Sequence, residues 1–201
     1  MNAQPAAQSA AEPHPAAALP AHLHRLVLTG FMGAGKTTIG RLLAQRLGWD
    51  FLDLDAYIES RAGLSVPSIF ATHGERHFRQ LESAALASAL GRNNIVLALG
   101  GGAPETLTNR LLLEQTPATS TIFLDAPFPT LFDRCMMQAL NPGQPDRPVL
   151  ADPVLAEARF LTRQPIYRRL ARLTLCTDNL TADETVDALL AGLSSSPAPR
   201  R

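Results

Sequence analysis

Gly30–Thr37 is the segment that most restricts the fold of this chain. It reads Gly-Phe-Met-Gly-Ala-Gly-Lys-Thr and matches G-x-x-x-x-G-K-[ST], a glycine-rich loop that wraps around phosphate oxygens. Lys36 is the only lysine among 18 basic residues. A compact ammonium group can reach along the phosphates of a nucleotide where a planar guanidinium is too bulky. The segment therefore predicts a nucleotide site built around Lys36.

The residues on either side of this loop are of the required kind. Leu26–Leu28 is a short apolar run, typical of a buried strand, and residues 38–47 carry apolar side chains at helical spacing before Gly48. A strand, a glycine loop and a helix in this order direct backbone N–H groups at the phosphates, next to the positive end of the helix.

The same alternation continues along the chain and predicts an α/β fold. Strands that are apolar almost throughout form parallel sheets covered by helices on both faces, here a three-layer sandwich, and ligands bind beyond the carboxyl ends of such strands. Further apolar runs lie at residues 51–52, 95–99, 121–124 and 173–176. Helical patterns lie at residues 55–62, 75–91, 105–114, 127–137, 153–170 and 181–192.

The length and the composition of the two ends indicate one domain with two tails. The 201 residues suffice for one domain with a sizeable core. Residues 1–22 are mostly Ala, Pro, Gln and Ser, and we expect them to form a disordered tail, as we do residues 194–201. The folded domain is expected to span residues 23–193.

The charge and the cysteines bear on partners and location. The formal net charge is zero, which argues against a nucleic-acid or membrane surface. Cys135 and Cys176 show no motif spacing, as expected in a reducing compartment. We expect a cytoplasmic monomer that binds a small molecule and neither nucleic acid nor membrane.

Acidic residues follow two of the predicted strands and are candidates for a magnesium site. The Thr37 hydroxyl is a hard oxygen ligand suited to Mg²⁺. Asp53 and Asp125 each follow an apolar run, so either could stand beside it. We favour Asp53, because Asp125 precedes Ala126-Pro127, where an aspartate also caps a helix well.

Asp55 lies two residues after Asp53 and could meet the phosphate acceptor. Its carboxylate could accept the proton of an acceptor hydroxyl or orient that hydroxyl. The alternative is that Asp55 only caps the following helix.

Two further segments are candidates for contact with a ligand. Gly100–Gly102 directly follows a strand and would allow close access to the backbone, unless it is only a turn. Residues 141–148 contain three prolines and form an exposed loop, either a lid or a plain connection.

Taken together, these segments resemble the shikimate kinase family. The resemblance runs from about residue 25 to residue 192. It rests on GFMGAGKTTIGRLLAQRLG at 30–48, FLDLDAYIESRAG at 51–63, IFATHGERHFRQLE at 69–82, LALGGGA at 97–103, DRPVL at 146–150 and RQPIYRR at 163–169. It implies a five-stranded parallel sheet of the nucleoside-monophosphate-kinase kind, a P-loop NTPase fold with a lid loop.

The resemblance also implies the reaction, transfer of the γ-phosphoryl group of ATP, with Mg²⁺, to the 3-hydroxyl of shikimate. This is a step in chorismate and aromatic amino-acid biosynthesis. The implied catalytic residues are Lys36, Asp55 and Arg147. ATP is expected to contact Gly33, Ala34, Gly35, Lys36, Thr37, Thr38 and Arg147. Shikimate is expected to contact Asp55, Arg79, Gly101 and Arg163, with the two arginines on its carboxylate, and Mg²⁺ to contact Thr37 and Asp53.

The chain departs from the family pattern before the lid. Arg134 is the nearest match to the arginine that stacks on adenine in the family, and residues 136–141 are extra length. Adenine contacts are also expected near residues 177–179.

Two other functions are compatible with a glycine loop. One is a different small-molecule kinase of the same fold, such as a gluconate kinase. The other is a nucleotide-binding regulator that has lost catalysis, although nothing here resembles a helix-turn-helix.

Overall fold

The predicted parallel sheet is confirmed by a computed structural model, which describes residues 19–139 and 152–195. Five strands lie in the order β2-β3-β1-β4-β5, each parallel to its neighbours. They are β1 (Arg25–Thr29), β2 (Asp50–Asp53), β3 (Ile95–Ala98), β4 (Thr119–Asp125) and β5 (Leu173–Cys176).

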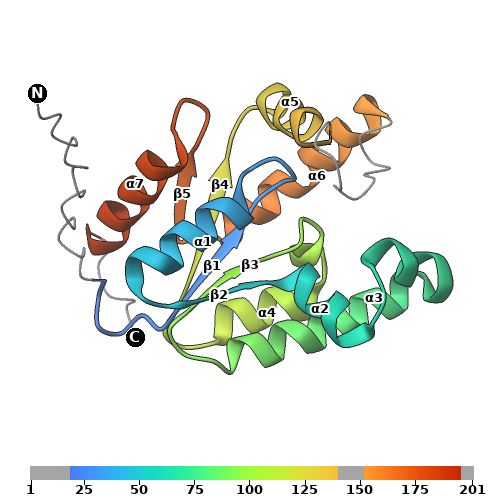
Figure 1. Ribbon diagram of the computed structural model, residues 1–201, viewed down its shortest axis with the longest axis horizontal. Helices are drawn as coiled ribbons and strands as arrows, with labels where there is room; N and C mark the ends of the chain where they lie inside the picture. The colour runs from blue at the N-terminus through green and yellow to red at the C-terminus, as the bar shows by residue number, and fades with distance from the viewer. Residues whose placement is uncertain (1–18, 140–151, 196–201) are drawn as a thin grey trace, which may run out of the picture.

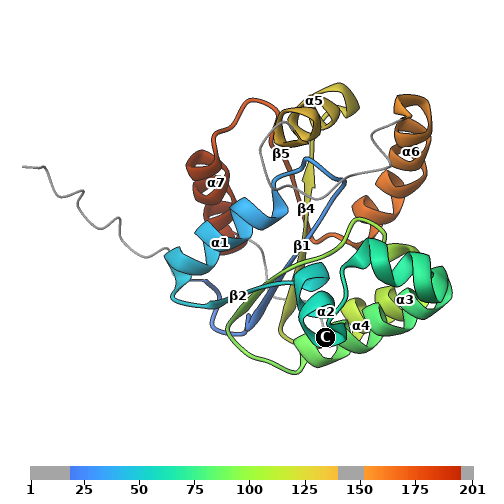
Figure 2. The same cartoon turned by 45° about the vertical axis from the view of Figure 1, so that its right-hand side comes forward.

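Helices connect the strands and cover both faces of the sheet (Figure 1). They are α1 (Lys36–Leu47), α2 (Leu54–Ala62), α3 (Val66–Leu90), the 3₁₀ turn η1 (Ala103–Glu105), α4 (Leu107–Gln115), α5 (Phe128–Ala139), α6 (Pro153–Leu170) and α7 (Ala182–Ser195). α1 and α7 lie side by side on one face, whereas α2, α3 and α4 lie together on the other (Figures 1 and 2). The molecule is therefore the expected three-layer sandwich.

Alternate residues of the central strand β1 belong to different cores, which explains why the strand is apolar throughout. Leu26 and Leu28 pack with Leu43 of α1 and Leu189 of α7. Val27 belongs to the cluster formed with α2, α3 and α4. All three β1 side chains are fully buried, as expected for a strand that is covered on both faces.

Helix α3 is longer than the sequence predicted. The pattern indicated a helix over residues 75–91, but α3 begins at Val66 and is kinked at Gly74, whose backbone is left-handed (φ 78°). The Ser65 side chain caps the added half by accepting from the N–H of Ser68. A glycine in this conformation interrupts the helical pattern, and for that reason the first half escaped detection.

The described residues also extend into the predicted tails. Leu19 packs against the core formed by β1, α1 and α7. Helix α7 continues through Ser194 and Ser195. Residues 1–18 and 196–201 lie outside the described part. No helix in the described part is long and apolar enough to cross a bilayer.

The strand order gathers the predicted site residues at one edge of the sheet. Leu28 of β1 and Asp53 of β2 both pair in register with Ala98 of β3. The residues that follow β1, β2 and β3 are Gly30, Leu54 and Leu99, and Gly100 comes directly after Leu99. The glycine loop, the acidic pair and the glycine triplet therefore lie side by side at the carboxyl ends of the strands.

Candidate active site

The glycine loop has a backbone that only glycine adopts readily. Gly33 and Gly35 have φ angles of 78° and 83°. A methyl group on Gly33 would overlap the backbone oxygen of Leu131 in α5 and lie 3.0 Å from Sγ of Cys135. Helix α1 then starts at Lys36 without a side-chain cap. The N–H groups of its first turn have no capping side chain, which suits an anion.

Lys36 folds back over this loop. Its ammonium nitrogen Nζ donates to the backbone oxygens of Gly30 and Phe31, both at 2.9 Å. The loop thus holds the only side-chain ammonium group of the chain.

The two predicted magnesium ligands lie in direct contact. The hydroxyl of Thr37 donates to Oδ2 of Asp53 at 2.8 Å. The other oxygen of Asp53 accepts from the N–H groups of Asp55 and Ala56, so Asp53, and not Asp55, caps α2. A hydroxyl and a carboxylate beside the phosphate loop are the kind of donors that Mg²⁺ takes alongside phosphate oxygens.

Asp125, the alternative magnesium ligand, is engaged elsewhere. Its Oδ2 accepts from Arg168 at 3.0 Å, and Gln164 donates to Oδ1 at 3.2 Å. Both partners come from α6, whereas the carboxylate in contact with Thr37 is that of Asp53.

Asp55 is the most perturbed acid of the site. Burial raises the pKa of its carboxyl from 3.8 to about 6, and the negative charge of Asp53 adds to the rise, while Lys36 opposes it. The carboxylate lies against the first glycine of the triplet, since a methyl group on Gly100 would come within 2.6 Å of Oδ1. A carboxylate with a raised pKa is a better proton acceptor than an ordinary aspartate.

Arg79 stands at the other end of the glycine triplet and is held by two glutamates of its own helix. Nη1 donates to both carboxylate oxygens of Glu82, at 2.9 and 3.1 Å, and Nη2 donates to Glu75 at 3.1 Å. A methyl group on Gly102 would lie 2.7 Å from Nη2 of Arg79. The absence of a side chain there is what admits the guanidinium.

Arg163 comes from a different helix, α6, and lies near the same triplet. Its Nη1 would be 3.7 Å from a methyl group on Gly101. Tyr167, one turn further along α6, donates its hydroxyl to the backbone oxygen of Gly101 at 2.5 Å. The structure thus brings Asp55, Arg79 and Arg163 together around Gly100–Gly102.

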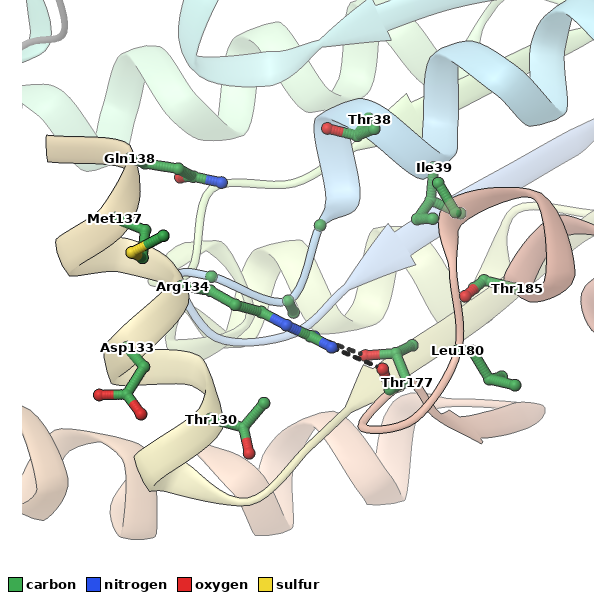
Figure 3. Close-up of a pocket in the computed structure, with 14 residues that line it drawn as sticks. Thr38, Ile39, Thr130, Asp133, Arg134, Met137, Gln138, Thr177, Leu180 and Thr185 are labelled. Carbon is green, nitrogen blue, oxygen red and sulfur yellow. Dashed lines mark hydrogen bonds between the residues drawn. The ribbon is translucent and has the colours of Figure 1, made fainter. Parts of the chain in front are cut away.

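A cavity of about 550 Å³ lies next to the glycine loop. Its lining includes Gly33–Gly35, Thr38, Arg134 and Thr177. Figure 3 shows Arg134 reaching from α5 towards Thr177, to which it donates two hydrogen bonds, at 3.1 Å to the hydroxyl and 2.7 Å to the backbone oxygen. The volume suits a small ligand such as a nucleoside.

Not every predicted residue can be placed. Arg147 and the lid at residues 141–148 lie outside the described residues. Conversely, sequence reasoning missed Glu75, Glu82, Glu105 and Tyr167. The first two stand four residues before and three residues after Arg79 on one helix, a spacing at which an arginine and a glutamate meet. This spacing can be read from the sequence, whereas no neighbouring residue indicated that Glu105 would lie beside the two arginines.

Comparison with known proteins identifies the family. The sequence model described as "Shikimate kinase" matches residues 32–194. The chain belongs to the shikimate kinase family. A shikimate kinase of Symbiobacterium thermophilum is 41% identical over 171 residues, which cover 84% of this chain and 95% of that protein. One from Neisseria gonorrhoeae is 40% identical over 174 residues and covers 85% and 96%.

Solved structures place the fold in the same shikimate kinase family. Shikimate kinase from Acinetobacter baumannii, in complex with shikimate, superposes with a TM-score of 0.77 at 34% identity, covering 85% of this chain and 93% of that one. A gluconokinase from Sinorhizobium meliloti, 20% identical, has a TM-score of 0.56 and covers 85% and 91%. The second likeness shows a shared fold alone.

Proposed function

We propose that this protein transfers the γ-phosphoryl group of ATP to the 3-hydroxyl of shikimate and so makes shikimate 3-phosphate and ADP. One observation carries the proposal beyond family membership. A buried acid with a raised pKa and two arginines converge on three consecutive glycines beside the phosphate loop. Shikimate, a small ring with one carboxylate and three hydroxyl groups, offers a matching partner to each of these side chains.

The anchoring of the acceptor follows from charge. Arg79 and Arg163 would bind its carboxylate through charge-assisted hydrogen bonds, which fix position and orientation together. The exposed fractions of the two side chains, 21% and 15%, limit screening by water and strengthen such contacts. The hydroxyl groups would then face Asp55 at the opposite end of the glycine triplet.

Phosphoryl transfer depends mainly on how the acceptor hydroxyl and the γ-phosphate are positioned relative to each other. The acceptor oxygen forms a bond to the γ-phosphorus while the bond from that phosphorus to the bridging β–γ oxygen breaks, and ADP leaves. Asp55 takes the proton of the attacking hydroxyl. Lys36 and the N–H groups of the glycine loop stabilise the charge on the phosphates.

A magnesium site and a role for Arg147 are also proposed. Thr37 and Asp53 would hold Mg²⁺, and the ion would supply positive charge to offset that of the phosphates. Arg147 would neutralise charge on the transferred group, and the segment around it would serve as a lid that keeps water away from ATP. We also propose that the protein is a cytoplasmic monomer that binds neither nucleic acid nor membrane.

ADP formation with different acceptors tests the function. The purified protein with ATP and Mg²⁺ is offered shikimate, gluconate and nucleoside monophosphates in parallel, and phosphorus NMR identifies the product. We expect ADP release to depend on shikimate and the new phosphate ester to sit at the 3-position. Faster turnover of gluconate would instead assign another kinase of this fold, and nucleotide binding without turnover of any acceptor would indicate a regulator.

A further inference from the structure

Glu105 places a carboxylate of the protein itself between the two arginines proposed to bind the acceptor. It ends the 3₁₀ turn η1, directly after the glycine triplet. Its Oε2 lies 2.7 Å from Nη2 of Arg163 and 3.8 Å from Nη2 of Arg79.

The hydrogen-bond donors of Arg79 show why this position matters. A guanidinium has five N–H groups in a fixed fork. In Arg79, Nε and Nη2 donate to Glu75, and Nη1 donates to both oxygens of Glu82. One N–H of Nη2 is left by this count, and the Glu105 carboxylate is the neighbouring acceptor. A ligand carboxylate would need this same N–H.

Arg163 also has an N–H group that a ligand carboxylate could bind, and it too lies beside Glu105. Glu105 is its ion-pair partner among the residues that the structure describes. Its Nε is buried and lacks a hydrogen-bond acceptor within residues 19–139 and 152–195. A buried donor without a partner is costly, and a bound acid could satisfy it.

The carboxylates around Arg79 differ in how easily they can move away. The Glu82 side chain is 1% exposed and is also within hydrogen-bond distance of Asn109, so it is fixed. The Glu105 side chain is 36% exposed, at the end of a single turn. Rotation about its own bonds would carry the Glu105 carboxylate into water without leaving it buried and unpaired.

We propose that Glu105 is a specificity-determining residue of the acceptor site, whose carboxylate occupies the place of the acceptor's carboxylate until the acceptor displaces it. The proposal rests on the proposed function. Glu105 balances the charges of Arg79 and Arg163 when no acceptor is bound, and on binding one carboxylate would replace another. The two arginines therefore keep a counter-ion in both states, and the affinity for the acid is lowered by the contact that it must break.

Removal of the Glu105 charge tests the inference. We expect Glu105→Gln and Glu105→Ala to lower the KM for shikimate by about three- to tenfold, the range expected for a partly exposed charge pair. The KM for ATP should not change, and kcat should stay within about twofold, because the competing contact is lost before the chemical step. Glu114→Gln, the same change on the exposed surface of α4, is the control and should leave all three constants unaltered.

Acetate gives a second readout that a merely structural role would not produce. With Glu105 removed, free acetate should occupy the vacated position, inhibit competitively against shikimate at lower concentration than in the wild type, and raise the melting temperature relative to chloride at equal ionic strength. Acetamide, of the same shape but neutral, should do neither. The melting curves also establish that each variant is folded.

Each outcome decides between the two proposals. A wild-type enzyme that does not phosphorylate shikimate would overturn the proposed function and this inference with it. An active wild type whose Glu105 variants show an unchanged KM for shikimate would overturn the inference alone. A higher KM in both variants would do the same, because it would show that Glu105 holds the arginines in place for the acceptor.

Discussion

The carboxylate of Asp55 lies against the α-carbon of Gly100, so closely that a methyl group there would approach Oδ1 to 2.6 Å. The two residues follow different strands, β2 and β3, which pair in register through Asp53 and Ala98. Gly100 is therefore required by the position of a side chain and not by a turn of its own backbone.

Gly100→Ala should displace Asp55 and lower kcat by about 100-fold, because a shift of about 1 Å at a reacting group has effects of that size. Gly91→Ala is the matched control, since a methyl group there would meet nothing nearer than 3.4 Å and the backbone is an ordinary right-handed one. Turnover and melting temperature of both variants check the prediction. Similar losses in both would contradict it.

The rate should depend on the ionisation of Asp55. Since burial raises the pKa of its carboxyl to about 6, kcat/KM for shikimate should rise with pH through about 6 and then level off, as the proton-accepting form appears. Asp55→Asn should lower kcat by about 100- to 10,000-fold and abolish this acidic limb. Rates measured from pH 5 to 8 provide the test. A limb that persists in the variant would assign the titration to another group.

The buried carboxylate of Asp55 should destabilise the folded protein at neutral pH. The folded pKa of about 6 lies above the ordinary 3.8, so the contribution of Asp55 is fully present below about pH 4 and is lost as the pH rises through 6. The Asp55→Asn variant should therefore unfold at a higher denaturant concentration than the wild type at pH 8, with a free energy of unfolding larger by about 1–3 kcal/mol. At pH 4 the free energies of unfolding of the two proteins should differ little.

Asp50→Asn is the control for this stability effect, because it removes the same charge from an exposed position of β2. We expect it to change the free energy of unfolding by less than about 0.5 kcal/mol at either pH. A pH-independent gain in Asp55→Asn would mean that packing, and not ionisation, causes it.

Lys36 should not tolerate replacement by arginine, although the charge is kept. Its ammonium fits between the backbone oxygens of Gly30 and Phe31, and a planar guanidinium cannot take the same place. We expect Lys36→Arg to lower kcat by at least about 100-fold. The reverse exchange, Arg41→Lys on the exposed side of the same helix, should leave turnover near the wild-type value. Steady-state rates decide, and an active Lys36→Arg variant would contradict the assigned role.

Thr37 and Asp53 should set the magnesium requirement. Their contact at 2.8 Å places the two proposed oxygen ligands together, so Thr37→Val and Asp53→Asn should each raise the Mg²⁺ concentration needed for half-maximal rate by about tenfold or more. Thr37→Ser retains the hydroxyl and should restore the wild-type requirement. Titration of Mg²⁺ at fixed ATP measures it, and an unchanged requirement in Asp53→Asn would favour another ligand.

The parts that sequence could predict are those encoded locally. The apolar runs predicted all five strands. In the central strand β1 the run reflects burial on both faces, as Leu26, Val27 and Leu28 illustrate, whereas the edge strands β2 and β5 are only partly buried. Gly33, Lys36 and Thr37 form one continuous motif, so their geometry follows from their spacing. Asp55 was proposed to meet the acceptor from its place after a strand, whereas Arg79 was assigned to the acceptor through the family resemblance alone. Both side chains lie against the glycine triplet.

The parts that could not be predicted depend on contacts between distant segments. The hydrogen bond from Tyr167 to Gly101 joins α6 to the end of β3, and no pattern within either segment announces it. Glu105 meets Arg163 for the same reason, because only the folded sheet brings η1 next to α6. The need for small residues at Gly100 and Gly102 likewise appears only when the side chains of Asp55 and Arg79 are in place.

The single lysine has a practical consequence. Because Lys36 carries the only side-chain amine of the chain and lies in the phosphate loop, reagents that acylate amines will modify one internal position, besides the α-amino terminus. Covalent labelling followed by mass spectrometry thus becomes a direct occupancy assay for nucleotide, in which protection from the reagent measures the filled fraction without any engineered reporter.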